Sequence, residues 1–177
     1  MNVLILADMD DLHWKHGRGQ ADLILSCGDL FDQVILEAAE AFACPMILAV
    51  KGNHDRQDPF SPPIIDLHLQ AKEVGGLKFG GLNGSWRYKP GPFHYEQKQV
   101  HTFLSDFPAV DVFLSHNSPK GVHEVDESIH QGFEGLMAYI AKVQPRLLIH
   151  GHQHVNQETQ VGGTKILGVH GYRLLSL

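Results

Sequence analysis

The chain has little cysteine and no long apolar run. Its 177 residues include only Cys27 and Cys44, which lie far apart and form no C-x-x-C pair. We expect two reduced, partly buried thiols rather than a disulfide framework. No run reaches the roughly 18 apolar residues of a membrane span, and residues 1–7 lack the basic region and apolar length of a signal peptide. These features predict a soluble, cytoplasmic protein without a membrane partner.

Basic residues are also in the minority. The 14 Lys and Arg residues against 20 Asp and Glu give a net charge of -6 with histidine neutral. A broad basic surface for nucleic acid is therefore not expected, and a nuclease would have only a thin basic channel. The residues of such a channel are Lys15, His16, Arg18, Arg87 and Lys89. The length and the 43% hydrophobic content predict a single domain over residues 1–177.

Short apolar runs alternate with helical patterns along the chain. The runs are continuous rather than alternating, which predicts buried central strands at residues 3–7, 23–27, 46–50, 110–115 and 147–150. Apolar residues at helical spacing predict helices at residues 32–42 and 132–143, with a weaker candidate at 95–104. Gly-Gly pairs between apolar runs predict hairpins at residues 73–83 and 158–169. The pattern indicates an α/β fold with a mixed sheet, parallel at its centre and antiparallel outside.

Polar clusters follow all five predicted strands. In open α/β sheets, ligands bind beyond the carboxyl ends of the strands, so these clusters should converge. One cluster alone is commonly a turn or a helix cap, but five in succession are hard to explain in that way. Packed carboxylates repel one another unless divalent cations lie between them. The clusters are Asp8 and Asp10; Gly28 and Asp29; Gly52 to Asp55; His116 and Asn117; and His150, His152 and His154.

The order of these clusters resembles the calcineurin-like metallophosphoesterases, in particular their small single-domain bacterial members. That family carries D-x-H, G-D-x-x-D, G-N-H-D/E, a lone His after a strand, and G-H-x-H. The corresponding segments here are Asp8 to Asp10, Gly28 to Asp32, Gly52 to Asp55, His116, and Gly151 to His154. The resemblance spans nearly the whole chain and implies a four-layer α/β sandwich with a mixed sheet.

The resemblance also implies a pair of divalent metals, Mn, Fe, Zn, Ni or Mg, with Mn or Fe favoured. Asp29 would bridge the two ions. Asp8 and His154 would hold the first, and the second would take the three remaining ligands, Asn53, His116 and His152. A hydroxide held between the metals would attack the phosphorus, so that no covalent protein nucleophile is needed.

His54 is the implied general acid, and Asp32 or Asp55 would accept a hydrogen bond from its ring. On the substrate side, Asn83 and Arg87 lie in a Gly-bounded polar loop after a strand, where Arg87 could pair with a phosphate oxygen. A plain solvated loop is the alternative. Asn117 could bind phosphate or cap a turn. The segment from Gly121 to His130, with His123, Glu124 and Asp126, resembles a loop beneath the site in a bacterial subgroup, where its histidines are structural or catalytic.

The first motif departs from the family, because Asp10 stands where the family has His. As a ligand, Asp10 would make the first site richer in oxygen and would favour Mn, Fe(II) or Mg over Zn. Alternatively Asp10 is too short to reach, and His13 or Asp11 replaces it, or the first site is weak. The predicted function is hydrolysis of a phosphodiester, such as a nucleotide, or of a phosphomonoester. The alternative is a scaffold for protein interaction, and a homodimer is plausible in either case.

Overall fold

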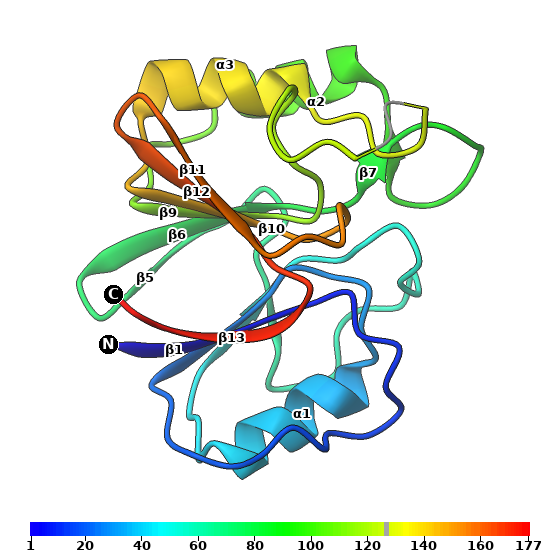
Figure 1. Ribbon diagram of the computed structural model, residues 1–177. Coiled ribbons are helices and arrows are strands. Elements are labelled where there is room, and N and C mark those ends of the chain that lie inside the picture. Colours follow the sequence, from blue (N-terminus) through cyan, green and yellow to red (C-terminus); the bar gives the residue numbers. More distant parts are fainter. Residues whose placement is uncertain (126–127) are drawn as a thin grey trace.

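The protein folds into four layers, a helix layer outside each of two stacked sheets (Figure 1). The computed structural model describes residues 1–125 and 128–177. On one outer face lies α1 (Asp32–Ala41), and on the other lie α2 (Gln97–Ser105) and α3 (Glu134–Val143). The mixed sheets and the three helices found among the described residues confirm the predicted α/β sandwich.

The sheet beside α1 has the strand order β13-β1-β2-β3-β4. Its strands from β1 to β4 are parallel to one another, and β13 pairs with β1 in the antiparallel sense. Their bounds are β1 Asn2–Ala7, β2 Leu23–Ser26, β3 Ile47–Ala49, β4 Ile65–Asp66 and β13 Gly171–Ser176. The carboxyl ends of β1, β2 and β3 therefore lie at the same edge as the amino end of β13.

The sheet beside α2 and α3 has the order β11-β12-β10-β9-β6-β5. Its four central strands are parallel, and the edge strands β11 and β5 are antiparallel to their neighbours. The bounds are β5 Ala71–Val74, β6 Leu77–Leu82, β9 Val112–Ser115, β10 Leu147–His150, β11 Gln157–Val161 and β12 Thr164–Gly168. A separate parallel pair joins β7 (Ser85–Trp86) and β8 (His94–Tyr95).

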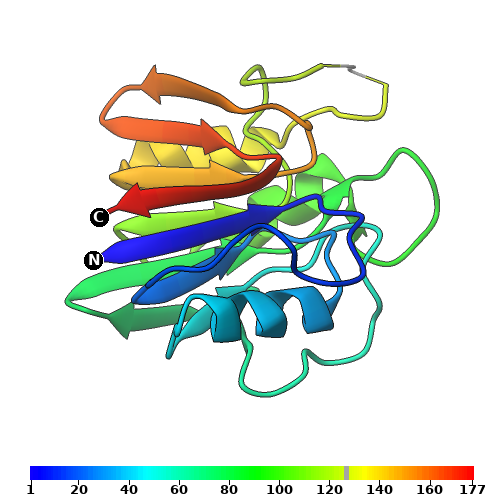
Figure 2. The same ribbon diagram turned by 60° about the horizontal axis from the view of Figure 1, so that its bottom comes forward.

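The two sheets face each other (Figure 2), and a cluster of buried apolar residues lies between them. Ile5, Leu25 and Leu114 are fully buried there, and separate apolar clusters lie between each sheet and its helices. Both faces of the central strands are thus covered, one by the other sheet and one by helices. This explains why these strands are continuous apolar runs. No helix in the described residues is long and apolar enough to cross a membrane.

The predicted strands and helices are found with small shifts of their ends, and both predicted hairpins form. The sequence did not predict the two-residue strands β4, β7 and β8 or the longer strand β13. Its residues alternate between intermediate and exposed positions, with Leu174 55% exposed, so it lacks the continuous apolar run of a buried strand. Tertiary pairing with β1 decides its conformation.

Candidate metal centre

The polar clusters after the predicted strands meet at one end of the two sheets, around an open cleft of about 1260 Å³. Parallel strands that share a sheet end at the same edge, so their following loops come together. The cleft is lined on its polar side by Asp8, Asp10, Asp29, Asp32, Lys51, His54, Asp55, Tyr88, His130, His152, His154 and His170. Most of the predicted site residues are therefore neighbours.

Four of the predicted ligands have left-handed backbones, a conformation that non-glycine residues rarely adopt. The φ angles are 52° at Asp8, 56° at Asp29, 60° at His152 and 52° at His154. Such strain concentrates at sites where the chain must hold a side chain in one place. The chain turns sharply after β1, β2 and β10, and the side chains of these four residues line the cleft.

Two motif glycines leave room for the ligand carboxylates. A Cβ atom on Gly52 would overlap Oδ1 of Asp29, and one on Gly151 would overlap Oδ2 of Asp8. The backbone N–H of His54 donates to Asp29 Oδ1 at 2.8 Å, and that of His152 donates to Asp8 Oδ2 at 2.8 Å. Because neither glycine has a side chain, the backbone N–H that follows it can come close enough to bind the carboxylate of a ligand on another strand.

The first ligand group joins Asp8, Asp29 and His116, and Asn53 lies beside it. His116 Nδ1 lies 2.8 Å from the backbone oxygen of Cys27, which can only accept, so Nδ1 carries the proton. In the neutral ring, Nε2 then presents a lone pair 3.0 Å from Asn53 Oδ1 and 3.3 Å from Asp29 Oδ2. With the ring neutral, three acceptors would converge on one point, which suits a metal ion; with the ring protonated, Nε2 donates to the two oxygens.

The charges of Asp29 and His116 stabilise each other, as the pKa shifts of the two groups show. Burial opposes charge on Asp29, yet His116 holds the pKa of that carboxyl well below its usual range. Burial alone would lower the pKa of His116, but Asp29 raises it to about 9. Without metal, a proton on His116 thus compensates the carboxylate. Burial holds the pKa of His152 well below its ordinary value, which keeps that ring in the neutral form that binds metals.

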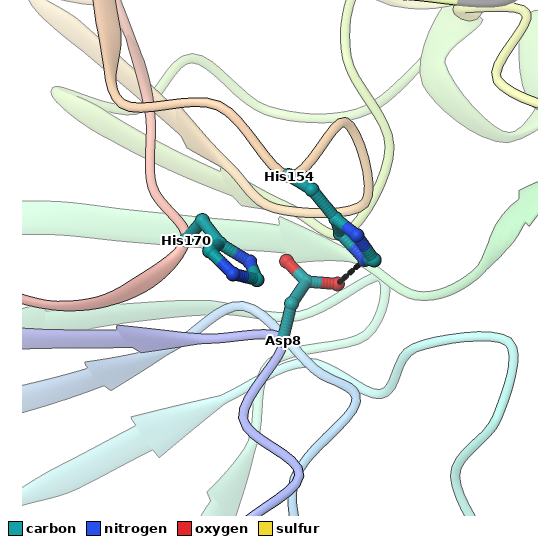
Figure 3. A group of neighbouring side chains, drawn as sticks. All are labelled: Asp8, His154 and His170. Atoms are coloured by element: carbon teal, nitrogen blue, oxygen red, sulfur yellow. Dashed lines mark ion pairs between the residues drawn. The ribbon is translucent and has the colours of Figure 1, made fainter.

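A second ligand group joins Asp8, His154 and His170, and its ligand atoms all lie within 4.8 Å of one another. Figure 3 shows the two imidazoles on either side of the Asp8 carboxylate. His154 Nε2 lies 3.6 Å from Asp8 Oδ1. In the part of the chain that the structure describes, neither Asp8 Oδ1 nor His152 Nε2, both buried, has a hydrogen-bond partner. Buried nitrogen and oxygen atoms of this kind fit the role of metal ligands.

The structure gives Asp55 a different role from the predicted partner of His54. Its carboxylate accepts the backbone N–H groups of Asp29 (3.0 Å), Leu30 (3.1 Å) and Gly52 (2.7 Å). Asp32 accepts from the backbone N–H of Ser61 at 2.6 Å. Neither carboxylate bonds the His54 ring within residues 1–125 and 128–177, so this part of the prediction is corrected.

Replacing Asp55 by asparagine should destabilise the fold by about 2–3 kcal/mol, because hydrogen bonds to a charged acceptor are lost and an amide N–H₂ is turned toward buried donors. Urea unfolding of the metal-free protein measures this. Asp32→Asn is the matched control, since its single N–H donor can still use the amide oxygen. Equal losses in the two variants would contradict the role assigned to Asp55.

The three predicted substrate contacts are engaged elsewhere. Arg87 donates to the backbone oxygen of His94 at 3.3 Å and pairs with Glu96 at 3.6 Å. Asn83 Oδ1 accepts the backbone N–H of Lys51 at 2.8 Å. Asn117 is fully buried, and its amide donates to the backbone oxygen of Gln131 at 2.8 Å. These side chains bond to the loops around the cleft, and their contact with a substrate stays a prediction.

Asp10 is exposed and stands outside both ligand groups, although it lines the cleft. The alternatives for the family histidine are engaged elsewhere too. His13 Nδ1 lies 2.9 Å from Glu37 Oε1, and Asp11 pairs with Lys15 and His16. Asp10 therefore stays a prediction that the geometry does not favour.

The histidines of the neighbouring loop lie around the site. His123 Nδ1 lies 2.9 Å from Nε2 of the buried His150, and the His130 and His152 ring centroids are 4.9 Å apart. Asp126 lies outside the described residues. Several cleft residues were not among the predicted site residues, among them Lys51, His170, and Tyr88, whose hydroxyl is 3.3 Å from Asn53 Nδ2. His170 comes two residues after the end of β12, a position like that of the assigned ligands, so the sequence did carry a signal for it.

The comparisons with known proteins agree with this arrangement. A sequence profile of the calcineurin-like phosphoesterase superfamily domain matches residues 1–169. The chain belongs to this superfamily. No curated protein is significantly similar to it in sequence. The match extends from the first strand through the end of β12, so it includes every motif from Asp8 to His154.

Several solved structures have a similar fold. Vps29 from Entamoeba histolytica complexed with Zn²⁺ has 16% identity and a TM-score of 0.52, and the similarity covers 100% of this chain and 86% of that one. Phosphopantetheinyl hydrolase from Mycobacterium tuberculosis has 11% identity, a TM-score of 0.56 and coverage of 95% and 89%. A putative 5'-nucleotidase from Staphylococcus aureus has 13% identity, a TM-score of 0.58 and coverage of 99% and 50%. These similarities establish the fold.

Proposed function

We propose that the protein is a phosphoester hydrolase that uses two divalent metal ions. The observation that carries the proposal is the convergence of metal-ligand side chains from several strand ends on one cleft. His116 Nε2 lies 3.0 Å from Asn53 Oδ1 and 3.3 Å from Asp29 Oδ2, and Asp8 Oδ1 is buried without a hydrogen-bond partner among the described residues. Ligand atoms around one metal at about 2.0–2.2 Å are roughly 3–3.5 Å apart.

Bound divalent cations would polarise a phosphoryl oxygen and make water a nucleophile at neutral pH. The chain's own residues would do the rest. Asp29, Asn53, His116 and His152 would hold one ion, and Asp8 with His154 the other, since these side chains already meet at the cleft. Asp8 belongs to both ligand groups, so its carboxylate connects them.

His54 is placed to complete the reaction. Its ring is exposed and lines the cleft, while its backbone N–H is anchored to Asp29 Oδ1. As water oxygen bonds to phosphorus and the ester P–O bond breaks, protonated His54 would give its proton to the departing alkoxide oxygen. Lys51 and Arg56 also line the cleft and add positive charge for the phosphate.

The open cleft favours a phosphodiester as substrate. The groups on both ester oxygens can extend out of such a cleft, so the protein need not enclose either of them. The test is to strip the full chain of metal, reload it with Mn²⁺, Fe²⁺, Zn²⁺ or Mg²⁺, and assay bis(4-nitrophenyl) phosphate beside 4-nitrophenyl phosphate. We expect metal-dependent turnover, faster with the diester. Binding of two metals without turnover of any phosphoester would favour the scaffold alternative.

His54→Asn should lower kcat by about 10²–10⁴-fold for esters with an alkyl leaving group. The loss should be much smaller for 4-nitrophenyl esters, whose leaving oxygen needs little protonation. Steady-state kinetics across a series of leaving groups measures the difference.

The matched control is His13→Asn, an exposed histidine that also lines the cleft but is bonded to Glu37. It should leave kcat unchanged with every leaving group. Metal content should be the same in both variants. An equal loss for alkyl and 4-nitrophenyl esters in His54→Asn would refute the general-acid role.

A further inference from the structure

We propose that His170 is a ligand of the first metal, in the place that the family gives to the histidine replaced here by Asp10. The first site would then hold Asp8, His154 and His170. This inference rests on the proposed function, because it assumes that two metals bind. It assigns a ligand that lies outside the family motifs and outside the matched residues 1–169.

Strand pairing places His170 beside Asp8. In the antiparallel ladder of β1 and β13, Ala7 is opposite Gly171. Asp8 is the residue after Ala7, and His170 is the residue before Gly171, so both lie one residue beyond the end of this ladder. The end of the sheet thus holds the two residues near each other and is a rigid support for ligands.

The loop that carries His170 is held in place by a side chain. Asn156 Oδ1 accepts the backbone N–H of His170 at 3.1 Å, and Asn156 Nδ2 donates to the backbone oxygen of His170 at 3.2 Å. Asn156 comes two residues after His154, so it ties the loop of one predicted ligand to that of the other. Asn156 thus satisfies both backbone groups of His170. The His170 side chain lines the cleft.

The side chains form a site with room for a cation. The His154 and His170 rings are 4.9 Å apart between centroids and tilted by 34°, on either side of the Asp8 carboxylate (Figure 3). The Asp8 side chain is only 2% exposed, and its Oδ1 has no hydrogen-bond partner within the described ranges. The 3.6 Å between this oxygen and His154 Nε2 is close to the spacing of two ligands on one metal.

Ligand chemistry sets the metal that such a site would take. Asp10 would supply a further hard oxygen, whereas His170 supplies a second imidazole beside that of His154. Two imidazoles and carboxylate oxygen suit Zn²⁺, Fe²⁺ or Ni²⁺ better than Mg²⁺. The expected metal preference therefore moves away from the oxygen-rich shell that Asp10 implies.

The experiment is a titration of the metal-stripped full chain with Zn²⁺ by calorimetry, and with Co²⁺ by visible absorption, whose bands report the ligands. The wild type should bind two ions. His170→Ala should weaken one site by at least about 100-fold, more than loss of an outer-shell partner, and should change the Co²⁺ bands of that site only. His170→Asp, which offers a carboxylate oxygen instead, should recover the second ion.

Asp10→Ala and His13→Ala are the controls, since both residues line the cleft outside the ligand groups. Both should bind two ions with wild-type affinity. Two unchanged sites in His170→Ala, or loss of one site in Asp10→Ala, would overturn the inference. The proposed function fails separately, if wild-type protein with two bound ions hydrolyses no phosphoester.

Discussion

Asp8→Asn is expected to lower kcat/KM for a phosphodiester by about 10³-fold or more and to remove both metals at concentrations that saturate the wild type. Asp8 is the residue that both ligand groups share, so its charge acts on both ions. Electrostatic stabilisation by a bound metal amounts to several kcal/mol, and each 1.36 kcal/mol is a factor of ten in rate. Metal content by atomic emission and steady-state kinetics measure the two effects.

The fold should survive this substitution. Asparagine tolerates the left-handed backbone of Asp8, and its amide oxygen can still accept the N–H of His152. Asp10→Asn is the matched control, because it removes a neighbouring carboxylate that lines the cleft but stands outside the groups. Retention of two ions and near wild-type activity in Asp8→Asn would show that the ligand groups are wrongly assigned.

Gly28→Ala is expected to destabilise the protein by about 4 kcal/mol and to abolish metal binding. Gly28 has φ +93°, and a Cβ atom would lie 2.7 Å from the Cα of Gly52. This close approach brings the Asp29 and Asn53 loops together, and backbone atoms on both sides cannot yield without moving ligands. Strain at a special φ combined with steric overlap is among the few causes of losses this large. Urea unfolding without metal measures the effect.

Gly76→Ala separates backbone strain from overlap. Gly76 also has a positive φ, +78°, in the turn between β5 and β6, but no atom lies within 4 Å of its Cβ position. It should cost about 1–2 kcal/mol from the left-handed backbone alone and leave metal binding intact. Similar losses in the two variants would show that the Gly28–Gly52 contact does not matter for stability.

The ligand motifs could be predicted because their information is local. A continuous apolar run followed at once by Asp, Asn or His places a polar side chain at the carboxyl end of a buried strand. Asp29, Asn53 and His116 meet as predicted because β2, β3 and β9 end at the same side of the two sheets. The two hairpins were predictable in the same way, since a Gly-Gly pair between apolar runs is a local turn signal.

The approach of His170 to Asp8 was not predicted. His170 follows the apolar end of β12, so a local signal existed for a polar residue at this edge. Its position beside Asp8 also depends on antiparallel pairing between the first strand and the last, and β13 has no buried face that would mark it as a strand. The departure at Asp10 was visible in the sequence, but the pairing that places His170 beside Asp8 was not.

The hydrogen-bond partners of two polar loop residues could not be predicted from proximity in sequence. Asp55 follows His54 directly, yet its carboxylate turns back to the N–H groups of Asp29 and Gly52. Arg87 lies in the expected loop, yet it is drawn to His94 and Glu96. A side chain's nearest partner in three dimensions depends on the backbone path of its loop, which residue type and spacing do not specify.

Anomalous diffraction from crystals grown with Zn²⁺ tests the central claim most directly. We predict two peaks roughly 3.5–4 Å apart at the carboxyl ends of the strands. One should contact Asp8, His154 and His170, and the other Asn53, His116 and His152, with Asp29 between them. A single peak, or peaks only at surface carboxylates away from the cleft, would contradict the account of this protein as a two-metal phosphoesterase.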